Sequence, residues 1–230
     1  MVKHNVAMIN EAVARLNMVE SQLRTNKVTD ERVLDAFLTV PRARFVPPAL
    51  RGNAYVDSDI PLGNGRAVMA PMVLARMLQA ASIGLHDKAL VIGCGSGYTT
   101  ALVSKIAASV VSVDSDTGCC TATRGAIGDL GYANVQVVEG PLATGWRAAG
   151  PYNVIVISGA VTTIPAGVSD QLAEGGRLVT VLEPDSRLPG AGVGQATLMT
   201  RAEGALSSRA MFDAAVCLLP EFGRAPGFVF

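Results

Sequence analysis

The stretch Lys88-Ala-Leu-Val-Ile-Gly-Cys-Gly-Ser-Gly-Tyr98 decides the fold of this chain. It predicts a short buried strand over 89–92 that ends in a glycine-rich turn and continues into a helix beginning near Tyr98. A strand that turns directly into a helix needs backbone angles that a Cβ atom disfavours, so the glycines have a steric reason. The start of such a helix carries unpaired N–H groups and a partial positive charge, which favours a ligand with an anionic or hydroxyl-rich end.

The glycines of this turn, Gly93, Gly95 and Gly97, follow the pattern Gly-x-Gly-x-Gly. The dinucleotide fingerprint would place its third glycine at Tyr98, and a phosphate-binding Walker loop would need Gly-Lys-Ser/Thr. A second predicted strand over 110–114 ends in Asp114, where a carboxylate can bind the two hydroxyls of a ribose. Methyltransferases that use S-adenosyl-L-methionine (SAM) and nucleotide dehydrogenases share this arrangement, and the glycine spacing favours the former. Taken alone, the glycine loop could also be a tight strand–helix turn of any α/β protein, and the presence of Asp114 makes this alternative less favoured.

Composition sets the outer limits of the interpretation. The length of 230 residues indicates one domain, or one domain with an elaborated end, and half of the residues are hydrophobic. The 19 basic residues balance the 19 acidic ones, so no charge field indicates nucleic acid or an anionic membrane as a partner. No run of 18 apolar residues occurs, so no transmembrane helix is predicted; we expect no cleavable leader and a cytoplasmic protein.

Cysteine and histidine are too few and too scattered to predict a metal site. The spacing of the four cysteines fits no zinc pattern, and neither histidine has a ligand partner at helical spacing. We expect reduced thiols, with Cys94 as a small residue in a tight place. The residues concerned are Cys94, Cys119, Cys120, Cys217, His4 and His86.

The rest of the chain predicts an α/β fold with a helical front end. The first part predicts helices over about 7–24, 29–40 and 71–81, with Thr29 as N-cap of the second, and a long loop over 51–70 that suits a binding element. After Lys88, strands alternate with helices, and continuous apolar runs indicate strands buried on both faces of a parallel sheet. The predicted strands are 89–92, 110–114, 135–138, 153–158 and 177–182, with helices near 98–107, 117–130 and 166–173. Antiparallel closing strands are predicted over 195–201 and 210–218, after a loop over 184–194.

Several pieces in order resemble the protein-L-isoaspartate O-methyltransferase family. They include Met18-Val-Glu-Ser-Gln-Leu-Arg24, Val40-Pro-Arg-Ala-Arg-Phe-Val-Pro47, Ala54-Tyr-Val-Asp57, Pro61-Leu-Gly-Asn-Gly65, Ala89-Leu-Val-Ile-Gly-Cys-Gly-Ser-Gly-Tyr98, Leu130-Gly-Tyr-Ala-Asn-Val135 and Glu174-Gly-Gly-Arg-Leu-Val179. The resemblance implies a Rossmann-like SAM-dependent methyltransferase fold, with a mostly parallel twisted sheet and helices on both faces. It implies one domain over 1–230, in which a helical N-terminal region (1–82) carries the substrate-side loop and 83–230 bind SAM.

The same resemblance implies a repair enzyme that methylates the stray carboxylate of isoaspartyl residues, which arise when Asn or Asp cyclises in ageing proteins. Its partner would be a damaged peptide or protein rather than nucleic acid or a membrane. The implied cofactor residues are Gly93, Cys94, Gly95, Ser96, Gly97, Asp114, Gly140 and Pro141, and the implied substrate-side residues are Asp57, Asn64, Arg66 and Met69.

The chain departs from the family at polar positions around the methyl centre. Met69 stands where the family has the serine of Thr-Ile-Ser-Gln-Pro, so no catalytic residue is assigned there. The other departures are Ala67 for the threonine, Arg66 and Ala70 for two glutamines, Val91 for an acid before the first glycine, and Pro141 for the acid of Gly-Asp-Gly. Arg66 is either a cation for the substrate carboxylate or a solvated arginine, and Asp57 and Asp59 either bind peptide or serve turns.

Three hypotheses follow from these departures. The first is an active isoaspartyl methyltransferase, and the second is a methyltransferase with another acceptor. The third is a family member without turnover that acts as a SAM-binding or protein-binding module. A nicotinamide dehydrogenase is a distant fourth, because Tyr98 interrupts its fingerprint.

Overall fold

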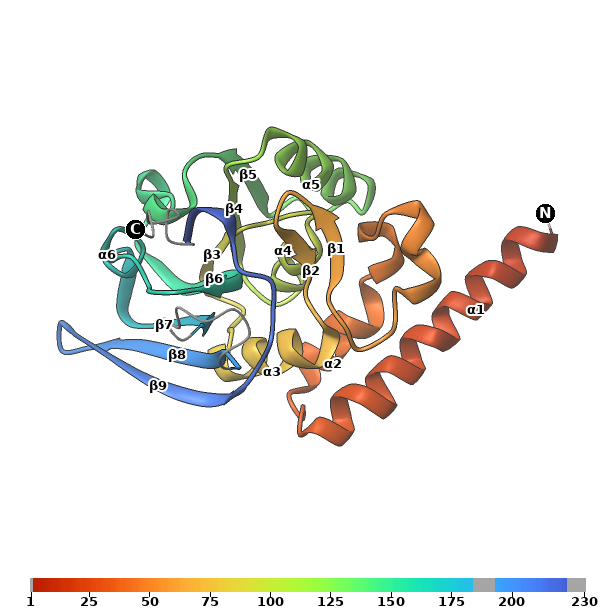
Figure 1. The fold of residues 1–230 in the computed structure, drawn as a ribbon, viewed down its shortest axis with the longest axis horizontal. Helices are drawn as coiled ribbons and strands as arrows, with labels where there is room; N and C mark the ends of the chain where they lie inside the picture. Colours follow the sequence, from red (N-terminus) through yellow and green to blue (C-terminus); the bar gives the residue numbers. More distant parts are fainter. Residues whose placement is uncertain (1, 184–192, 223–230) are drawn as a thin grey trace, which may run out of the picture.

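A seven-stranded sheet organises the protein in the computed structural model, which describes residues 2–183 and 193–222 (Figure 1). The strand order is β5-β4-β3-β6-β7-β8-β9, and the first five strands run parallel. The last two pair antiparallel and project from the body as a hairpin, as Figure 1 shows at its lower left. The strands are β3 (Lys88–Ile92), β4 (Ser109–Asp114), β5 (Val135–Glu139), β6 (Tyr152–Val161), β7 (Leu172–Leu182), β8 (Gln195–Ala202) and β9 (Ala205–Asp213). The predicted mostly parallel sheet is therefore confirmed.

The helices cover the sheet unequally. One face carries a large core that receives side chains from α1 to α5, whereas shorter pieces, including α6, cover the other face. Figure 1 shows α1 at the lower right, running out beyond the rest of the molecule. The helices are α1 (Val2–Met18), α2 (Glu31–Thr39), α3 (Pro71–Ala81), α4 (Tyr98–Ser104), α5 (Thr117–Asp129) and α6 (Ala166–Ser169). No helix within 2–183 and 193–222 is both long and apolar enough to cross a membrane.

Several predicted boundaries were wrong for identifiable reasons. Asp30, not Thr29, caps α2, because the Asp30 carboxylate accepts a hydrogen bond from the Arg32 N–H at 2.9 Å. Helix α6 ends at Ser169 because the chain enters β7 at Leu172, well before the predicted strand start. The last strand ends at Asp213 rather than at 218. Part of the predicted loop over 184–194 lies outside the described residues.

The predicted loop over 51–70 contains a small β-hairpin. Strand β1 (Ile60–Gly63) pairs with β2 (Arg66–Val68) around the turn Asn64-Gly65. Both turn residues have positive φ angles, 49° and 69°, as a two-residue hairpin turn requires. Sequence reasoning missed this hairpin, although Asn-Gly is a strong short-range hairpin signal.

A buried polar cluster joins the front end of the chain to the start of α4. The guanidinium carbon of Arg42 lies 4.8 Å from the ring centroid of Tyr98, and Arg42 donates to the carbonyl of Ala54 at 2.7 Å. Phe37 and Phe45 pack on the same ring. The hydroxyl of Tyr98 is buried and has no hydrogen-bond partner among the described residues. Burial raises the pKa of Tyr98 to about 12.

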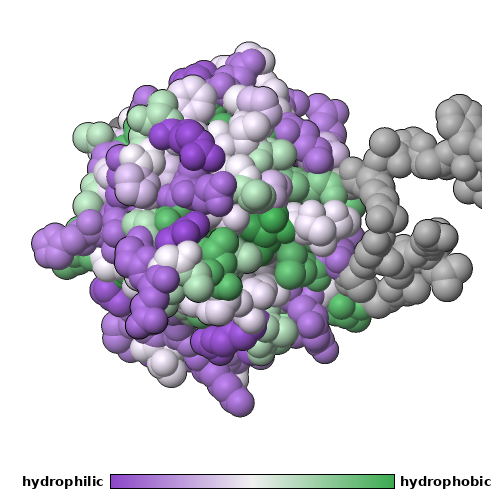
Figure 2. Space-filling model, turned by 90° about the vertical axis from the view of Figure 1, so that its left-hand side faces the viewer, coloured by the Kyte–Doolittle hydropathy of each residue, from purple (hydrophilic) through white to green (hydrophobic). Residues whose placement is uncertain are grey.

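The outer surface is mixed in character. Figure 2 views the molecule from the left-hand side of Figure 1 and shows apolar side chains gathered near the centre of this face, with polar side chains around them. The four cysteines are all free thiols, as the sequence predicts.

Candidate functional site

The glycine-rich loop between β3 and α4 has the backbone that the sequence predicts. Gly93, Gly95 and Gly97 adopt φ angles of 78°, 55° and 94°, in the left-handed region that L side chains rarely occupy. A Cβ atom on Gly97 would also lie 3.0 Å from Cγ2 of Thr123. Glycine is therefore required here by backbone conformation and by space.

The two other residues of the loop have different environments. Cys94 is buried and its thiol accepts a hydrogen bond from Thr123 at 3.3 Å. Burial raises the pKa of Cys94, which disfavours the thiolate that a nucleophilic role would need. The Oγ atom of Ser96 is buried and has no partner within the part of the chain that the structure describes. A buried hydroxyl in that condition fits a site where a ligand supplies the partner.

Asp114 lies at the carboxyl end of β4 and faces the glycine loop. Its Oδ2 accepts a hydrogen bond from the Gly95 N–H at 3.1 Å, and its side chain is fully buried. Strand β4 is the parallel neighbour of β3, with Ile92 opposite Val113, so the two strand ends meet at one edge of the sheet. The expected pairing of loop and carboxylate is thus present in the structure.

Arg66 occupies a position that differs from both sequence-based interpretations. It is neither solvated nor directed at a substrate-side group; instead it forms a buried ion pair with Asp114. Its Nη2 and Nε lie 2.5 Å and 2.9 Å from Oδ1 of Asp114, and Nη2 lies 3.1 Å from the hydroxyl of Ser115. Burial opposes the charge on Arg66, but the hydrogen bond and charge of Asp114 outweigh it, and the pKa of Arg66 is raised.

Two leucine side chains lie directly over the glycine loop. A Cβ atom placed on Gly93 would lie 3.0 Å from Cδ1 of Leu219, and one on Gly95 would lie 3.0 Å from Cδ1 of Leu62. Leu219 is held in place by its backbone, whose N–H donates to the Ala160 carbonyl at the end of β6 at 3.0 Å. In this conformation the loop is therefore covered by the protein's own side chains.

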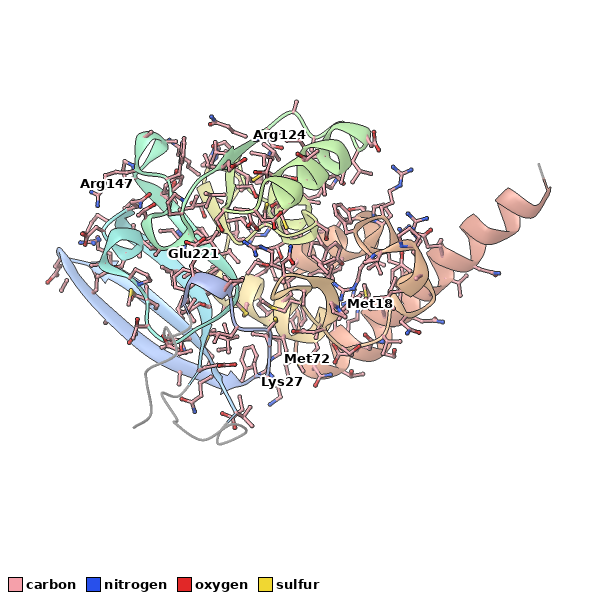
Figure 3. The ribbon with its side chains drawn as sticks, turned by 45° about the horizontal axis from the view of Figure 1, so that its top comes forward. Met18, Lys27, Met72, Arg124, Arg147 and Glu221 are labelled. Atoms are coloured by element: carbon pink, nitrogen blue, oxygen red, sulfur yellow. The ribbon has the colours of Figure 1, made fainter. Side chains whose placement is uncertain are left out.

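The turn after β5 forms the third part of this sheet edge. The N–H of Gly140 donates to the Asp114 carbonyl at 3.0 Å, and the Trp146 ring lies 3.4 Å from where a Cβ on Gly140 would be. Pro141 is exposed, and the next N–H, that of Leu142, donates to Oε2 of Glu221 at 2.8 Å. Sequence reasoning missed Glu221, because no local pattern tells which loop a residue near the C-terminus will contact. Figure 3 labels Glu221, which lies toward the middle of the molecule.

The acidic residues of the substrate-side loop, Asp57 and Asp59, both accept hydrogen bonds from backbone N–H groups. Oδ1 of Asp57 accepts from the Met72 N–H at 2.9 Å, so it serves the first turn of α3. Asp59, which is partly buried, accepts from the Ala70 N–H at 2.7 Å and from the Cys217 N–H at 3.1 Å. Burial raises the pKa of Asp59 despite these two donors. The structural interpretation of both acids, as groups that organise a turn, is the one that these contacts support.

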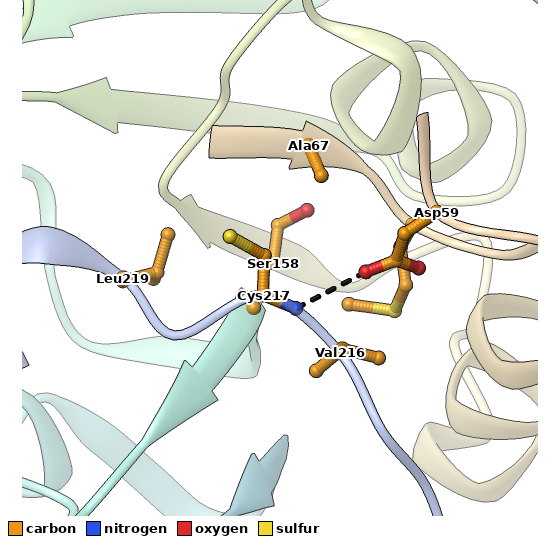
Figure 4. Close-up of a pocket in the computed structure, with 8 residues that line it drawn as sticks. Asp59, Ala67, Ser158, Val216, Cys217 and Leu219 are labelled. Carbon is orange, nitrogen blue, oxygen red and sulfur yellow. Dashed lines mark hydrogen bonds between the residues drawn. The ribbon is translucent and has the colours of Figure 1, made fainter. Parts of the chain in front are cut away.

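Met69 is buried in the wall of a small cavity. Figure 4 shows this cavity, with the hydrogen bond from Cys217 to Asp59 drawn as a dashed line. Its volume is about 10 Å³, enough for roughly one water molecule. The remaining lining residues are Ala67, Ser158, Gly159, Val216 and Leu219. Asn64, the last predicted substrate-side residue, is exposed and donates to Oδ2 of Asp116 at 3.3 Å.

The site residues fall into two groups. The structure brings Arg66 and Asn64, both predicted on the substrate side, to the sheet edge that carries the glycine loop and Asp114, whereas Asp57 and Met69 lie near the start of α3. Within the described residues, no three of His, Cys, Asp or Glu lie together as metal ligands. The sheet edge combines a glycine face, a buried carboxylate now paired with Arg66, a hydroxyl without a partner among the described residues, and a backbone N–H now bonded to Glu221. Once Arg66 and Glu221 move away, these are groups that a nucleoside with a ribose diol can use.

Comparisons with known proteins agree with this geometry. The sequence model of the family described as protein-L-isoaspartate(D-aspartate) O-methyltransferase matches residues 14–189. Named protein-L-isoaspartate O-methyltransferases include one of Koribacter versatilis, 38% identical over 73% of this chain and 76% of the relative. Another, of Anaeromyxobacter dehalogenans, is 42% identical over 66% of this chain and 73% of the relative.

Solved structures show the same fold. A protein-L-isoaspartate O-methyltransferase superposes with a TM-score of 0.76 at 23% identity, over 91% of this chain and 67% of that one. A Plasmodium falciparum protein of that description, solved in complex with S-adenosyl-L-homocysteine, superposes with a TM-score of 0.75 at 18% identity, over 92% and 98% of the two chains.

Proposed function

Because this chain belongs to the protein-L-isoaspartate O-methyltransferase family, we propose that it methylates the free carboxylate of isoaspartyl residues in damaged proteins, with SAM as methyl donor. The observation that carries the proposal is the pairing of the glycine loop with the buried carboxylate of Asp114, whose Oδ2 lies 3.1 Å from the Gly95 nitrogen. This pairing lies in the part of the chain that the family sequence model covers, 14–189.

The residues at the sheet edge fit this donor, although the described conformation covers them. Gly93, Gly95 and Gly97 offer a face without side chains, and Ser96 offers a buried hydroxyl that has no partner among the described residues. We assign the ribose hydroxyls to Asp114. Gly140, Pro141 and the Leu142 N–H would hold the base. Cys94 contributes a neutral, compact side chain to the loop.

Methyl transfer to a carboxylate needs little acid–base chemistry from the protein. When bound, SAM supplies an electrophilic methyl group on a positively charged sulfur. The acceptor carboxylate is already ionised at neutral pH, so no general base has to remove a proton. The protein's task is to align the two groups and exclude water, for which effective molarities can reach about 10⁵ M or more.

The substrate side follows from the same reasoning. Asp57 and Asp59 fix the backbone at the start of α3, and this fixes where Met69 lies. Met69 supplies packing where the family has an orienting hydroxyl. A lost oxyanion donor costs about 2.7–4 kcal/mol in other enzymes, which slows a transfer without abolishing it. We therefore expect turnover with a lowered rate constant.

The domain organisation, the free thiols and the net charge bear on where this activity would take place and on which partners. We propose one domain, in which residues 1–82 present the acceptor and 83–230 hold the donor, because Arg66 and Asp114 join the two parts in a buried contact. Four free thiols suit a reducing compartment such as the cytoplasm, and a net charge of zero gives no electrostatic reason for a nucleic-acid partner.

Two measurements test the proposal. Isothermal titration calorimetry should detect binding of S-adenosyl-L-homocysteine (SAH), the demethylated product, and Asp114→Asn should weaken it. A peptide with one isoaspartyl residue should then become a methyl ester, whereas the same peptide with ordinary aspartate should not. Failure of wild-type protein to bind SAH or SAM at millimolar concentration would refute the assignment.

A further inference from the structure

The β1–β2 hairpin, residues 60–68, closes on the donor site through contacts at its tip. Arg66 pairs with Asp114, and the side-chain amide of Asn64 donates to Asp116. Leu62 lies against Gly95. The hairpin tip thus contacts the glycine loop and the end of β4 at the same time.

Asp114 has little acceptor capacity left in this conformation. Its Oδ1 accepts from Arg66 Nε at 2.9 Å, from Arg66 Nη2 at 2.5 Å and from the Asp116 N–H at 3.1 Å. Its Oδ2 accepts from the Gly95 N–H at 3.1 Å. Each carboxylate oxygen offers about two lone-pair positions, so Oδ1 is fully occupied by its three donors and Oδ2 keeps one position. A ribose diol, which donates two hydrogen bonds, therefore cannot bind Asp114 in full until Arg66 leaves.

Glu221 occupies a group assigned to the base of the donor, as Arg66 occupies the group assigned to the ribose. The carboxylate of Glu221 accepts from the Leu142 N–H at 2.8 Å, the N–H that we assign to the base of the donor. Arg66 and Glu221 lie far apart in the sequence. Each satisfies a polar group that the donor would otherwise satisfy.

We propose that Arg66 is a positioning residue that competes with the donor for Asp114 and holds the β1–β2 hairpin closed over the donor site. The inference rests on the proposed function, since it takes the donor site to be the one assigned above. Arg66 adds a positive charge beside a carboxylate where a cationic donor must also bind. Electrostatic repulsion between the two cations therefore favours its departure, in addition to the competition for hydrogen bonds.

The closed state lowers the apparent affinity for the ligand. When only a fraction of the protein is open, the apparent dissociation constant rises in inverse proportion to that fraction. Arg66→Gln removes the cation and leaves a shorter amide that ends near the position of Nε, so it should shift the population to the open state. Glu221→Gln should act in the same direction but more weakly, because Glu221 is exposed and competes for a single N–H.

The experiment is calorimetric titration of SAH into wild-type protein and three variants. Arg66→Gln should bind SAH at least ~10-fold more tightly than wild type, as expected for a closed state favoured about ten to one. The matched control is Arg124→Gln on α5, an exposed arginine whose guanidinium bonds the Val137 carbonyl and which Figure 3 shows at the top of the molecule. The control should bind SAH as wild type does, and Glu221→Gln should lie between the two.

A measurement on wild-type protein keeps the inference testable if Arg66→Gln folds poorly. The Nε–H of Arg66 should give a hydrogen-bonded ¹⁵N–¹H signal in protein without ligand, identified by its absence from Arg66→Lys. Saturation with SAH should remove this signal. Trp146, the only tryptophan in the chain, packs on Gly140 and should report the same binding by fluorescence.

The outcomes separate the inference from the proposed function. Binding by wild type with tighter binding by Arg66→Gln supports both. Binding by wild type that is unchanged or weakened in Arg66→Gln, or an Nε–H signal that persists at saturating SAH, overturns the role of Arg66 and leaves the enzyme assignment standing. If wild type and both site variants fail to bind SAH at all, the proposed function fails first.

Discussion

The buried Arg66–Asp114 pair gives a prediction of stability that can be worked from its geometry. Asp114→Asn removes the negative charge but leaves the shape, so the Asn amide can still accept from Gly95 through its oxygen. Its nitrogen must then face the guanidinium of Arg66, which is 6% exposed and would keep only the Ser115 hydroxyl and the Asn64 carbonyl. Removing one partner of a buried pair in this way costs about 3–5 kcal/mol.

A double-mutant cycle measures how much of that cost belongs to the pair. Asp114→Asn with Arg66→Gln leaves two neutral amides, so the double variant should regain at least ~2 kcal/mol relative to the sum of the single changes. For a chain of this size, a loss of 3–5 kcal/mol corresponds to a fall in melting temperature of roughly 6–20 °C. Urea unfolding followed by the fluorescence of Trp146 and by circular dichroism gives the free energies.

A second ion pair serves as the control for this cycle. Arg177 and Asp87 lie 2.6 Å apart, but both are partly exposed, and Arg177 also donates to the carbonyl of Ala81. Asp87→Asn should therefore cost no more than about 1–2 kcal/mol. If Asp114→Asn costs less than ~1 kcal/mol, or if the two changes at the buried pair are additive, the pair does not exist in solution as described and the reasoning fails.

The other predictions concern the loop, the buried tyrosines and the methyl centre. Tyr98→Phe should leave the free energy of unfolding at pH 7 unchanged or raise it by up to ~2 kcal/mol, because the Tyr98 hydroxyl has no partner among the described residues. Tyr152→Phe should lower it by about 1 kcal/mol, because the Tyr152 hydroxyl donates to the Trp146 carbonyl at 2.6 Å. Burial raises the pKa of Tyr98 to about 12, so the unfolded state releases this proton at a lower pH than the folded state. The free energy of unfolding of wild type should therefore fall between about pH 10 and 12, as measured by urea titrations across that range. The fall should be smaller in Tyr98→Phe. Gly97→Ala should cost at least ~2 kcal/mol in the same assay, since φ is 94° and Cγ2 of Thr123 lies 3.0 Å from the added atom; a neutral result would contradict the backbone described here. Met69→Ser should raise the rate constant for an isoaspartyl peptide by ~10-fold or more over Met69→Ala, which opens the same space without a hydroxyl; equal rates would mean that more than the hydroxyl separates this site from its relatives.

The sequence predicts those parts of the site that depend on residues close to one another in the chain. Continuous apolar runs identify β3 and β4, and parallel pairing then brings Asp114 beside the glycine loop without further information. The positive φ angles of Gly93, Gly95 and Gly97 follow from the residue type and the spacing. These inferences need only a few neighbouring residues, which is why they hold in the structure.

The part that the sequence does not predict depends on contacts between distant segments. Arg66 reaches Asp114 across 48 positions, because the Asn64-Gly65 turn folds the hairpin back over the sheet edge. Glu221 reaches Leu142 across 79 positions. Such long-range pairs are fixed by the packing of whole elements, and residue type alone allowed Arg66 to be solvent-exposed or substrate-binding.

The turn that carries the closing hairpin has a chemical weakness of its own. In Asn64-Gly65 the second residue has no side chain to hinder its backbone nitrogen from attacking the amide carbon of the first, with loss of ammonia and formation of a cyclic imide. Reopening of that ring would put a carboxylate where the Asn64 amide now donates to Asp116, and attraction would become repulsion. In the isoaspartyl product the turn would also gain one backbone carbon, which a two-residue connection cannot absorb without losing register. We therefore expect deamidation of this turn, the kind of damage that its family repairs, to weaken the contact of the hairpin tip with Asp116 and to favour the open donor site.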